Sequence, residues 1–133
     1  MENCIFCKII KKEILCDKIY EDENFLAFLT IGPVADGHLL IVPKKHIVWM
    51  QDADDETISG IFKLSKKLMS SLKNSFKCDY VSLSVAGEEI PHFHIHLIPR
   101  YINDGLYNFP NKKYKDGESR KKKKKIISSI PSR

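Results

Sequence analysis

The sequence has no long hydrophobic run, and this excludes the proteins that depend on such runs. No apolar stretch among its 133 residues approaches the ~20 residues that a helix needs to cross a bilayer. The first residues are an acid followed by a cysteine pair, which does not resemble a secretory signal. We therefore expect a cytoplasmic protein with no membrane partner.

Internal repeats and Gly/Ser-rich linkers are also absent, which argues against a second folded domain. The length fits one domain with a single core, and an apolar content of 43% with 29% charged residues is that of an ordinary globular protein. Cysteine is scarce, with four residues at positions 4, 7, 16 and 78. In a cytoplasmic chain we interpret these as metal ligands or buried thiols rather than disulfides.

Positive charge is concentrated near the C-terminus. The net charge is +5, but residues 101–133 hold ten basic and three acidic residues, a balance of +7. Residues 1–100 therefore carry 12 basic against 14 acidic residues, a balance of −2. A slightly acidic body is not a general nucleic-acid binder, so we expect no specific nucleic-acid partner. We interpret the run Lys121–Lys125 as a solvated helix face, with a nuclear-import or nucleic-acid patch as the alternative.

The apolar periodicity predicts an α+β fold built on a mainly antiparallel sheet. Alternating or continuous apolar residues predict strands at 18–21, 24–29, 38–43, 79–85 and 93–100. Apolar side chains at three- and four-residue intervals, from Ile58 to Phe76, predict one long helix over about 54–76. Shorter helical segments are expected at 4–10 and 118–130. Strands that are mostly sequential with one long helix inserted are typical of the α+β class.

The five histidines occupy three places: His38, His46 and the cluster His92, His94 and His96. Alternate residues of a strand face the same side, so the three clustered rings are expected in one row about 6.6–7 Å apart. Several titratable rings side by side favour a functional site over ordinary packing. Two chemistries remain open from the pattern. One is a catalytic zinc bound by the cluster, and the other is attack of an imidazole on a phosphoryl centre.

A second feature offers ligands for a metal. Cys4 and Cys7 have the spacing of half a zinc site, and a thioredoxin-like redox pair is the alternative, although the strand and helix context of that motif is absent. Two thiolates need two further ligands in a closed tetrahedral site. His46 and one outer histidine of the cluster would complete such a site, which would leave the other histidines free for chemistry.

Three ordered motifs make the sequence resemble the histidine triad (HIT) family, in the branch of nucleotide phosphoramidases and dinucleoside polyphosphate hydrolases. The motifs read CIFCKII from Cys4, DGHLLIVPKKH from Asp36, and AGEEIPHFHIHLIPR from Ala86. The resemblance extends to Tyr101. It implies a HIT-like catalytic domain over residues 1–110, followed by a basic and helical C-terminal extension over residues 111–133.

The resemblance also implies an activity, a cofactor and an oligomeric state. His94 would attack the α-phosphorus to form a covalent nucleotidyl-histidine, water would release the nucleoside monophosphate, and His96 would contact the phosphate or the leaving group. A structural zinc would be held by Cys4, Cys7, His46 and His92. Family members are homodimers joined through the long helix and a continuous sheet. A nucleotidyl transferase and a nucleotide-binding or scaffolding protein with weak activity are the alternatives.

Four residues are the candidates for substrate binding: Thr30, Ile31, Gly87 and Glu88. Backbone amides of the Gly87 turn are suited to stabilise a phosphoryl transition state. Many relatives have an aspartate where Thr30 stands and a glutamine where Glu88 stands. Thr30 retains a hydroxyl for a ribose contact, whereas an ionised Glu88 would repel a phosphate. The nucleophilic centre therefore looks intact and the nucleotide contacts look altered. We interpret His38 as a hydrogen-bonded structural residue.

Overall fold

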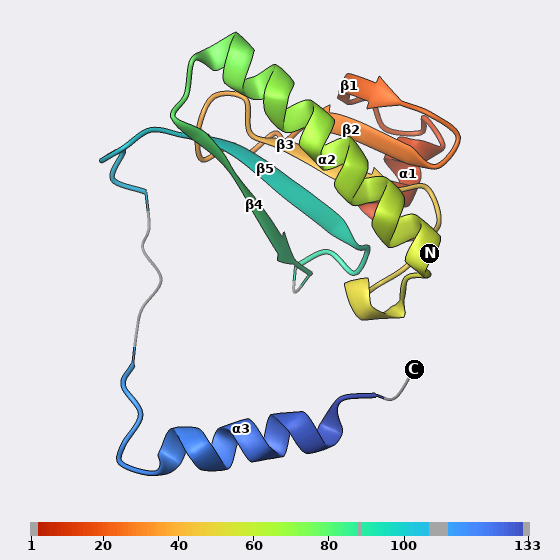
Figure 1. Cartoon of the computed structure of the whole chain (residues 1–133). Coiled ribbons are helices and arrows are strands. Elements are labelled where there is room, and N and C mark those ends of the chain that lie inside the picture. Colours follow the sequence, from red (N-terminus) through yellow and green to blue (C-terminus); the bar gives the residue numbers. More distant parts are fainter. Residues whose placement is uncertain (1–2, 88, 107–111, 132–133) are drawn as a thin grey trace.

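The protein is described here by a computed structural model that covers residues 3–87, 89–106 and 112–131. The described elements, in chain order, are α1 (Ile5–Ile10), β1 (Asp17–Glu21), β2 (Phe25–Leu29), β3 (Leu39–Pro43), the short 3-10 turn η1 (Met50–Asp52), α2 (Asp55–Phe76), β4 (Tyr80–Ala86), β5 (His94–Arg100) and α3 (Glu118–Ser129). Among these residues the strands form one antiparallel sheet in the order β1-β2-β3-β5-β4, and α2 lies across one of its faces (Figure 1). The predicted α+β fold is confirmed.

The long helix α2 begins and ends at residues suited to those positions. The Asp54 carboxylate accepts the backbone N–H of Thr57 at 2.7 Å, which satisfies one of the free amides of the first turn. The helix ends at Lys77, whose backbone takes the left-handed conformation common after a helix C-terminus. The buried face carries Ile61, Leu64, Ser65, Leu68 and Leu72. These side chains pack on the sheet and anchor α2 to it.

Side-chain alternation along β5 separates two clusters, one on each face of the sheet. Phe93, just before the strand, and Ile95 and Leu97 within it belong to the larger cluster with α2. His94 and His96 face the other way. The smaller cluster on that side contains side chains of α1 with its N-cap, of β2 and of β3, namely Cys4, Phe6, Cys7, Ile9, Leu26, Phe28, Leu40 and Val42. The alternation of histidine with apolar residues therefore directs the two rings of β5 away from α2.

Phe76 is the last residue of α2 and of its apolar pattern, and its side chain is 37% exposed. Its ring lies against Gly37, where an added Cβ would stand 2.6 Å from a ring carbon. Gly37 also has a φ of +87°, a conformation that favours glycine. The loop before β3 is thus held against the C-terminal end of α2, and this contact positions the neighbouring His38.

Helix α3 stands apart from the rest of the chain in Figure 1. Its bounds confirm the helix predicted for residues 118–130, and none of its residues is buried. The domain boundary predicted at residues 110 and 111 falls outside the described residues and stays a prediction. In the described ranges, no helix combines the length and the apolar character needed to cross a membrane.

Candidate active site and metal centre

The backbone holds His94 in one tautomer. Its Nδ1 lies 2.7 Å from the carbonyl oxygen of His92, and because a carbonyl can only accept, Nδ1 carries the proton. The ring is buried, and the edge of Phe6 contacts it with ring centroids 5.0 Å apart. In the neutral imidazole, Nε2 then keeps a free lone pair. A neutral imidazole held in this way can act as a nucleophile without a base to deprotonate it.

His38 and His96 form a second hydrogen-bonded chain. The backbone N–H of Val34 donates to His38 Nδ1 at 3.2 Å, which places the proton of the neutral His38 ring on Nε2. His38 Nε2 lies 2.9 Å from Nδ1 of His96, so this N–H donates and His96 Nδ1 accepts. His96 must then carry its own proton on Nε2. A loop amide thus determines, through two rings, which nitrogen of His96 can donate a hydrogen bond.

Both rings of this chain are neutral near pH 7. Burial lowers the pKa of His38. The pKa of His96 falls to about 4, chiefly through burial and further through the neighbouring His94 and His38. A protonated His96 would present an N–H to His38 instead of a lone pair, which the Val34 contact opposes. The structure therefore makes His96 Nε2 a neutral hydrogen-bond donor.

Four side chains, two of them from the first turn of α1 and its N-cap, lie close together. The Sγ and ring-nitrogen atoms of Cys4, Cys7, His46 and His92 all lie within 4.8 Å of one another. The Sγ of Cys4 is 3.3 Å from His92 Nδ1, and the Sγ of Cys7 is 3.2 Å from His46 Nδ1 and 3.5 Å from His92 Nδ1. With metal bonds of about 2.3 Å to sulfur and 2.0 Å to nitrogen, ligands of a tetrahedral zinc stand roughly 3.5 Å apart. The spacing fits a tetrahedral metal ion.

The surroundings of these four residues fit a cation as well. His92 Nε2 donates to the carbonyl oxygen of Pro43 at 2.8 Å, which leaves Nδ1 deprotonated and free as a ligand. Burial and the adjacent Cys4 raise the pKa of Cys7 to about 11. A bound cation would oppose this rise in the pKa of Cys7, because it stabilises the thiolate. His92 lies before β5 rather than within it, so the expected row of three equivalent rings reduces to His94 and His96, with centroids 5.0 Å apart.

An apolar cavity of about 470 Å³ includes Phe6, whose ring contacts His94, in its wall. Thr30 and Ile31, two predicted substrate-binding residues, both line it. The other lining residues, which the sequence reasoning missed, are Ile5, Phe6, Ile9, Ile14, Leu15, Cys16, Asp17, Phe28, Leu29, Leu40 and Ile90. Phe6 joins the cavity to the reaction centre, because its ring also contacts His94. The apolar spacing in α1 was the one signal that could have indicated this wall.

The other two predicted substrate contacts have different outcomes. Gly87 is buried, and a Cβ at this position would lie 2.9 Å from the ring of Trp49, so the close approach requires glycine. Trp49 is a neighbour of this turn that the motifs did not indicate. Glu88 lies outside the described residues. A role for the Gly87 amides in binding phosphate stays a prediction.

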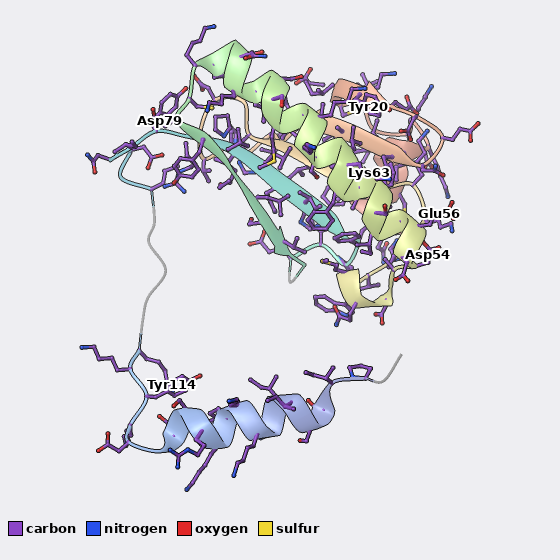
Figure 2. All side chains as sticks on the ribbon, viewed as in Figure 1. Tyr20, Asp54, Glu56, Lys63, Asp79 and Tyr114 are labelled. Carbon is purple, nitrogen blue, oxygen red and sulfur yellow. The ribbon has the colours of Figure 1, made fainter. Side chains whose placement is uncertain are left out.

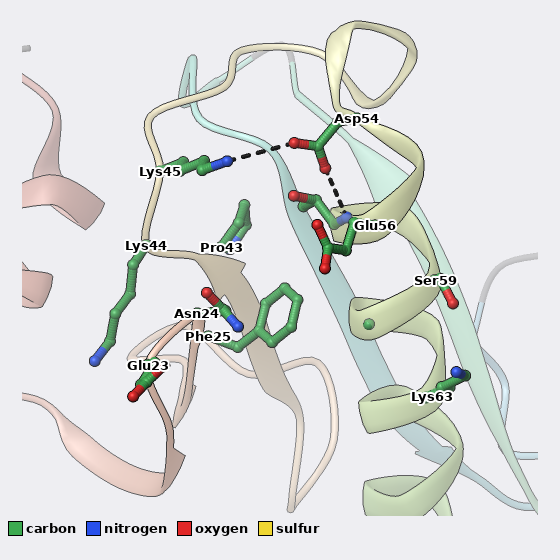
Figure 3. Close-up of a pocket in the computed structure, with 12 residues that line it drawn as sticks. Glu23, Asn24, Phe25, Pro43, Lys44, Lys45, Asp54, Glu56, Ser59 and Lys63 are labelled. Atoms are coloured by element: carbon green, nitrogen blue, oxygen red, sulfur yellow. Dashed lines mark hydrogen bonds and ion pairs between the residues drawn. The ribbon is translucent and has the colours of Figure 1, made fainter.

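A larger cavity of about 580 Å³ lies between the β2–β3 region and the first turns of α2 (Figure 3). Its lining contains no histidine or cysteine. Charged side chains on its walls form ion pairs, as between Lys45 and Asp54 at 3.4 Å, and Figure 2 shows Asp54 and Glu56 at this end of the helix. Neither cavity has a histidine in its lining, but Phe6 of the apolar cavity contacts the ring of His94, so the apolar cavity is the candidate for the active site.

Comparison with known proteins agrees with this geometry. The model of the HIT domain matches residues 11–103, a range that contains the triad and the loop with His38. The chain belongs to the HIT family. Members most similar in sequence include the adenosine 5'-monophosphoramidase of Saccharomyces cerevisiae, 40% identical over 98 residues that cover 73% of this chain and 62% of the yeast protein.

Solved structures of the HIT family reproduce the fold. A HIT family member from Bacillus subtilis is 34% identical, with a TM-score of 0.88, and the superposition covers 98% of this chain and 99% of that protein. A zinc-bound histidine triad protein from Mycobacterium smegmatis is 28% identical, with a TM-score of 0.75 and coverage of 97% and 99%. The fold and the family of the chain are therefore established together.

Proposed function

We propose that this protein is a nucleotide hydrolase that acts at the α-phosphorus of nucleoside phosphoramidates or dinucleoside polyphosphates. The observation that carries the proposal is the 2.7 Å hydrogen bond from His94 Nδ1 to the His92 carbonyl, which leaves Nε2 as a neutral nucleophile. Membership of the HIT family and the similarity to a yeast phosphoramidase support the choice of substrate class.

In the first step, the lone pair of His94 Nε2 attacks the α-phosphorus, a P–N bond forms, and the bond to the leaving group breaks with its electron pair. His96 Nε2–H donates a hydrogen bond to the atom that gains this negative charge. In the second step, water attacks the nucleotidyl-histidine and gives up a proton to the solvent, the electron pair of the P–N bond returns to His94 Nε2, and the nucleoside monophosphate leaves. A phosphate leaving group needs no proton. An amine leaving group takes up a proton from the solvent before it departs, because neutral His96 cannot release its proton without becoming an anion.

We place the nucleoside of the substrate in the apolar cavity. The Thr30 Oγ1 accepts the N–H of Gly32 at 3.3 Å, so its hydroxyl hydrogen remains available for a ribose oxygen. Ile31 lies at the rim and is almost fully exposed. Cavities of this size and apolar character bind flat rings with few polar contacts. The Gly87 amides and Glu88 would lie toward the phosphates.

We propose zinc as the ion held by Cys4, Cys7, His46 and His92, because two thiolates and two imidazoles in a tetrahedral arrangement favour it. The relative from Mycobacterium smegmatis is zinc-bound. The ion would link α1, the loop after β3 and the start of β5, and so hold the backbone that orients His94. All four cysteines are unpaired, and we accordingly propose a cytoplasmic location.

We propose that the protein forms a homodimer through β4 and α2. Among the described strands β4 forms one edge of the sheet, so its outer N–H and C=O groups have no strand partner there. Tyr80 and Val85 on this strand are 47% and 40% exposed. A second copy that adds its β4 to this edge would bury them and continue the sheet.

The hydrolase proposal is tested with adenosine phosphoramidate and a dinucleoside polyphosphate, each assayed with wild type and His94→Ala. We expect the variant to lose at least 10³-fold in rate, because it lacks the nucleophile, and we expect acid-quenched wild type to retain a nucleotide adduct on His94. Ser70→Ala, at an exposed position of α2 away from the histidines, serves as the control variant. Full activity in His94→Ala would refute the assignment. Nucleotide binding by wild type without turnover of either substrate would leave the binding-protein alternative.

A further inference from the structure

Helix α3 is not expected to be stable by itself. It has twelve residues, a length at which isolated helices are marginal in water. Its five consecutive lysines include like charges one turn apart, Lys121 and Lys125, which weaken a helix further. A helix in this chain therefore needs a surface to pack against.

The apolar side chains of α3 point to such a surface. Ile126, Ile127 and Ile130 are 62%, 55% and 63% exposed. At 100° per residue the three lie on one side of the helix, and most of the lysines lie on the other. The described body of the same chain does not supply the cover, because α3 packs extensively against none of its elements and stands clear of it in Figures 1 and 2. The exposed isoleucine side of α3 is therefore available to pack against another molecule.

The Bacillus subtilis relative has a C-terminal segment as well. Its superposition covers 98% of this chain, which extends the matched region into residues 112–131.

The position of α3 is suited to a second copy of this chain. Figure 1 shows α3 on the side of the body where β4 forms the sheet edge. The eleven residues 107–117 can span at most about 36 Å, which exceeds the radius of a domain of this size.

We propose that the two chains of the dimer exchange their C-terminal helices, so that α3 of each chain packs through Ile126, Ile127 and Ile130 on the body of the other. This inference rests on the proposed dimer and extends it. The lysine side of α3 would remain in solvent. The long reach of the C-terminal segment would then serve to cross the partner rather than to carry a separate nucleic-acid patch.

Isotope-mixed cross-linking tests the exchange on the full chain. Equal amounts of ¹⁴N and ¹⁵N protein are mixed until native mass spectrometry shows mixed dimers, and a lysine-reactive reagent is added. Digestion after glutamate releases residues 119–133 with their cross-links. We expect about half of the links between α3 and the body to join a ¹⁴N to a ¹⁵N peptide. Links between Lys18 and Lys44, which both contact Glu21, provide the control for contacts within one chain and should never be mixed.

Two variants separate docking of α3 from unspecific cross-linking. Ile126→Asn with Ile130→Asn should remove most links from α3 to the body, whereas Ser128→Asn, on another side of the same helix, should keep them. Mixed dimers whose α3 links are all within one chain would overturn the exchange alone. Monomers only, in native mass spectrometry, would overturn the proposed dimer together with the exchange. Neither result would bear on hydrolysis by His94.

Discussion

Replacing His38 tests whether the hydrogen-bonded chain from Val34 to His96 acts in catalysis. His38→Leu removes both of its bonds, to the Val34 amide at 3.2 Å and to His96 Nδ1 at 2.9 Å. Each such bond contributes about 1 kcal/mol. Together the two bonds favour the His96 tautomer with the proton on Nε2 by about 2 kcal/mol. If the transition state depends fully on this tautomer, the loss of both bonds lowers the rate about 30-fold.

The effect should depend on the leaving group. The N–H of His96 stabilises negative charge on the departing atom, so the loss should be largest where that charge is localised. We expect kcat/KM of His38→Leu to fall about 30-fold for the phenyl ester of AMP and less than about threefold for the 4-nitrophenyl ester, whose charge is delocalised. His38→Gln is the matched variant, because its amide N–H can still donate to His96.

The reasoning fails if His38→Leu loses activity equally on both esters. Such a result would mean that His38 only supports the fold, as the motif alone had indicated. It also fails if His38→Leu and His38→Gln are indistinguishable, because a donor to His96 would then be irrelevant. Circular dichroism and the metal content of the variants would exclude a general loss of structure.

Three further predictions follow from the site and the sheet. Wild type should hold one zinc per chain by metal analysis, Cys7→Ser should lose it, and His94→Ala should keep it; the reverse pattern would favour a catalytic zinc. Because the pKa of His96 is about 4 in the folded protein and near 6.5 when unfolded, the unfolded state binds more protons between these values. The free energy of unfolding should therefore fall as pH decreases from 6.5 to 4, and His96→Asn should reduce that slope in urea titrations; an unchanged slope would contradict the pKa. Val85→Lys on the β4 edge should give monomers in sedimentation, whereas Ile19→Lys on the opposite edge strand should leave dimers; dimers in both would place the interface elsewhere.

The sequence was sufficient to predict those helices and strands that depend on interactions between residues close together in the chain. The strand before Pro43 and the helix after Asp54 follow from apolar spacing and a capping carboxylate, which act within a few residues. The spacing of Cys4 and Cys7 indicated half of the candidate metal cluster, whereas the choice of His92 over His96 came from the resemblance to the HIT family. The contact of Phe76 with Gly37 could not be predicted from the helix pattern, because the two residues are distant in the chain.

The contact between His38 and His96 could not be predicted in the same way. It joins residues 58 positions apart and depends on the pairing of β3 with β5, in which Leu40 lies opposite His96. The contact of Phe6 with His94 could not be predicted from the sequence either. Its place in an apolar pattern predicts burial, but its contact with the His94 ring arises only when α1 packs on the sheet. Tertiary register thus decides which buried side chains reach the reaction centre.

His92 serves two neighbours at once, since its ring belongs to the metal cluster while its carbonyl oxygen holds the ring of His94. If an ion is bound there as proposed, its removal would loosen the backbone that orients His94 and, through Cys4 and Cys7, also α1, whose Ile5, Phe6 and Ile9 line the apolar cavity. The metal site and the proposed nucleoside site would therefore be disturbed together, and a chelator should lower nucleotide binding as well as turnover.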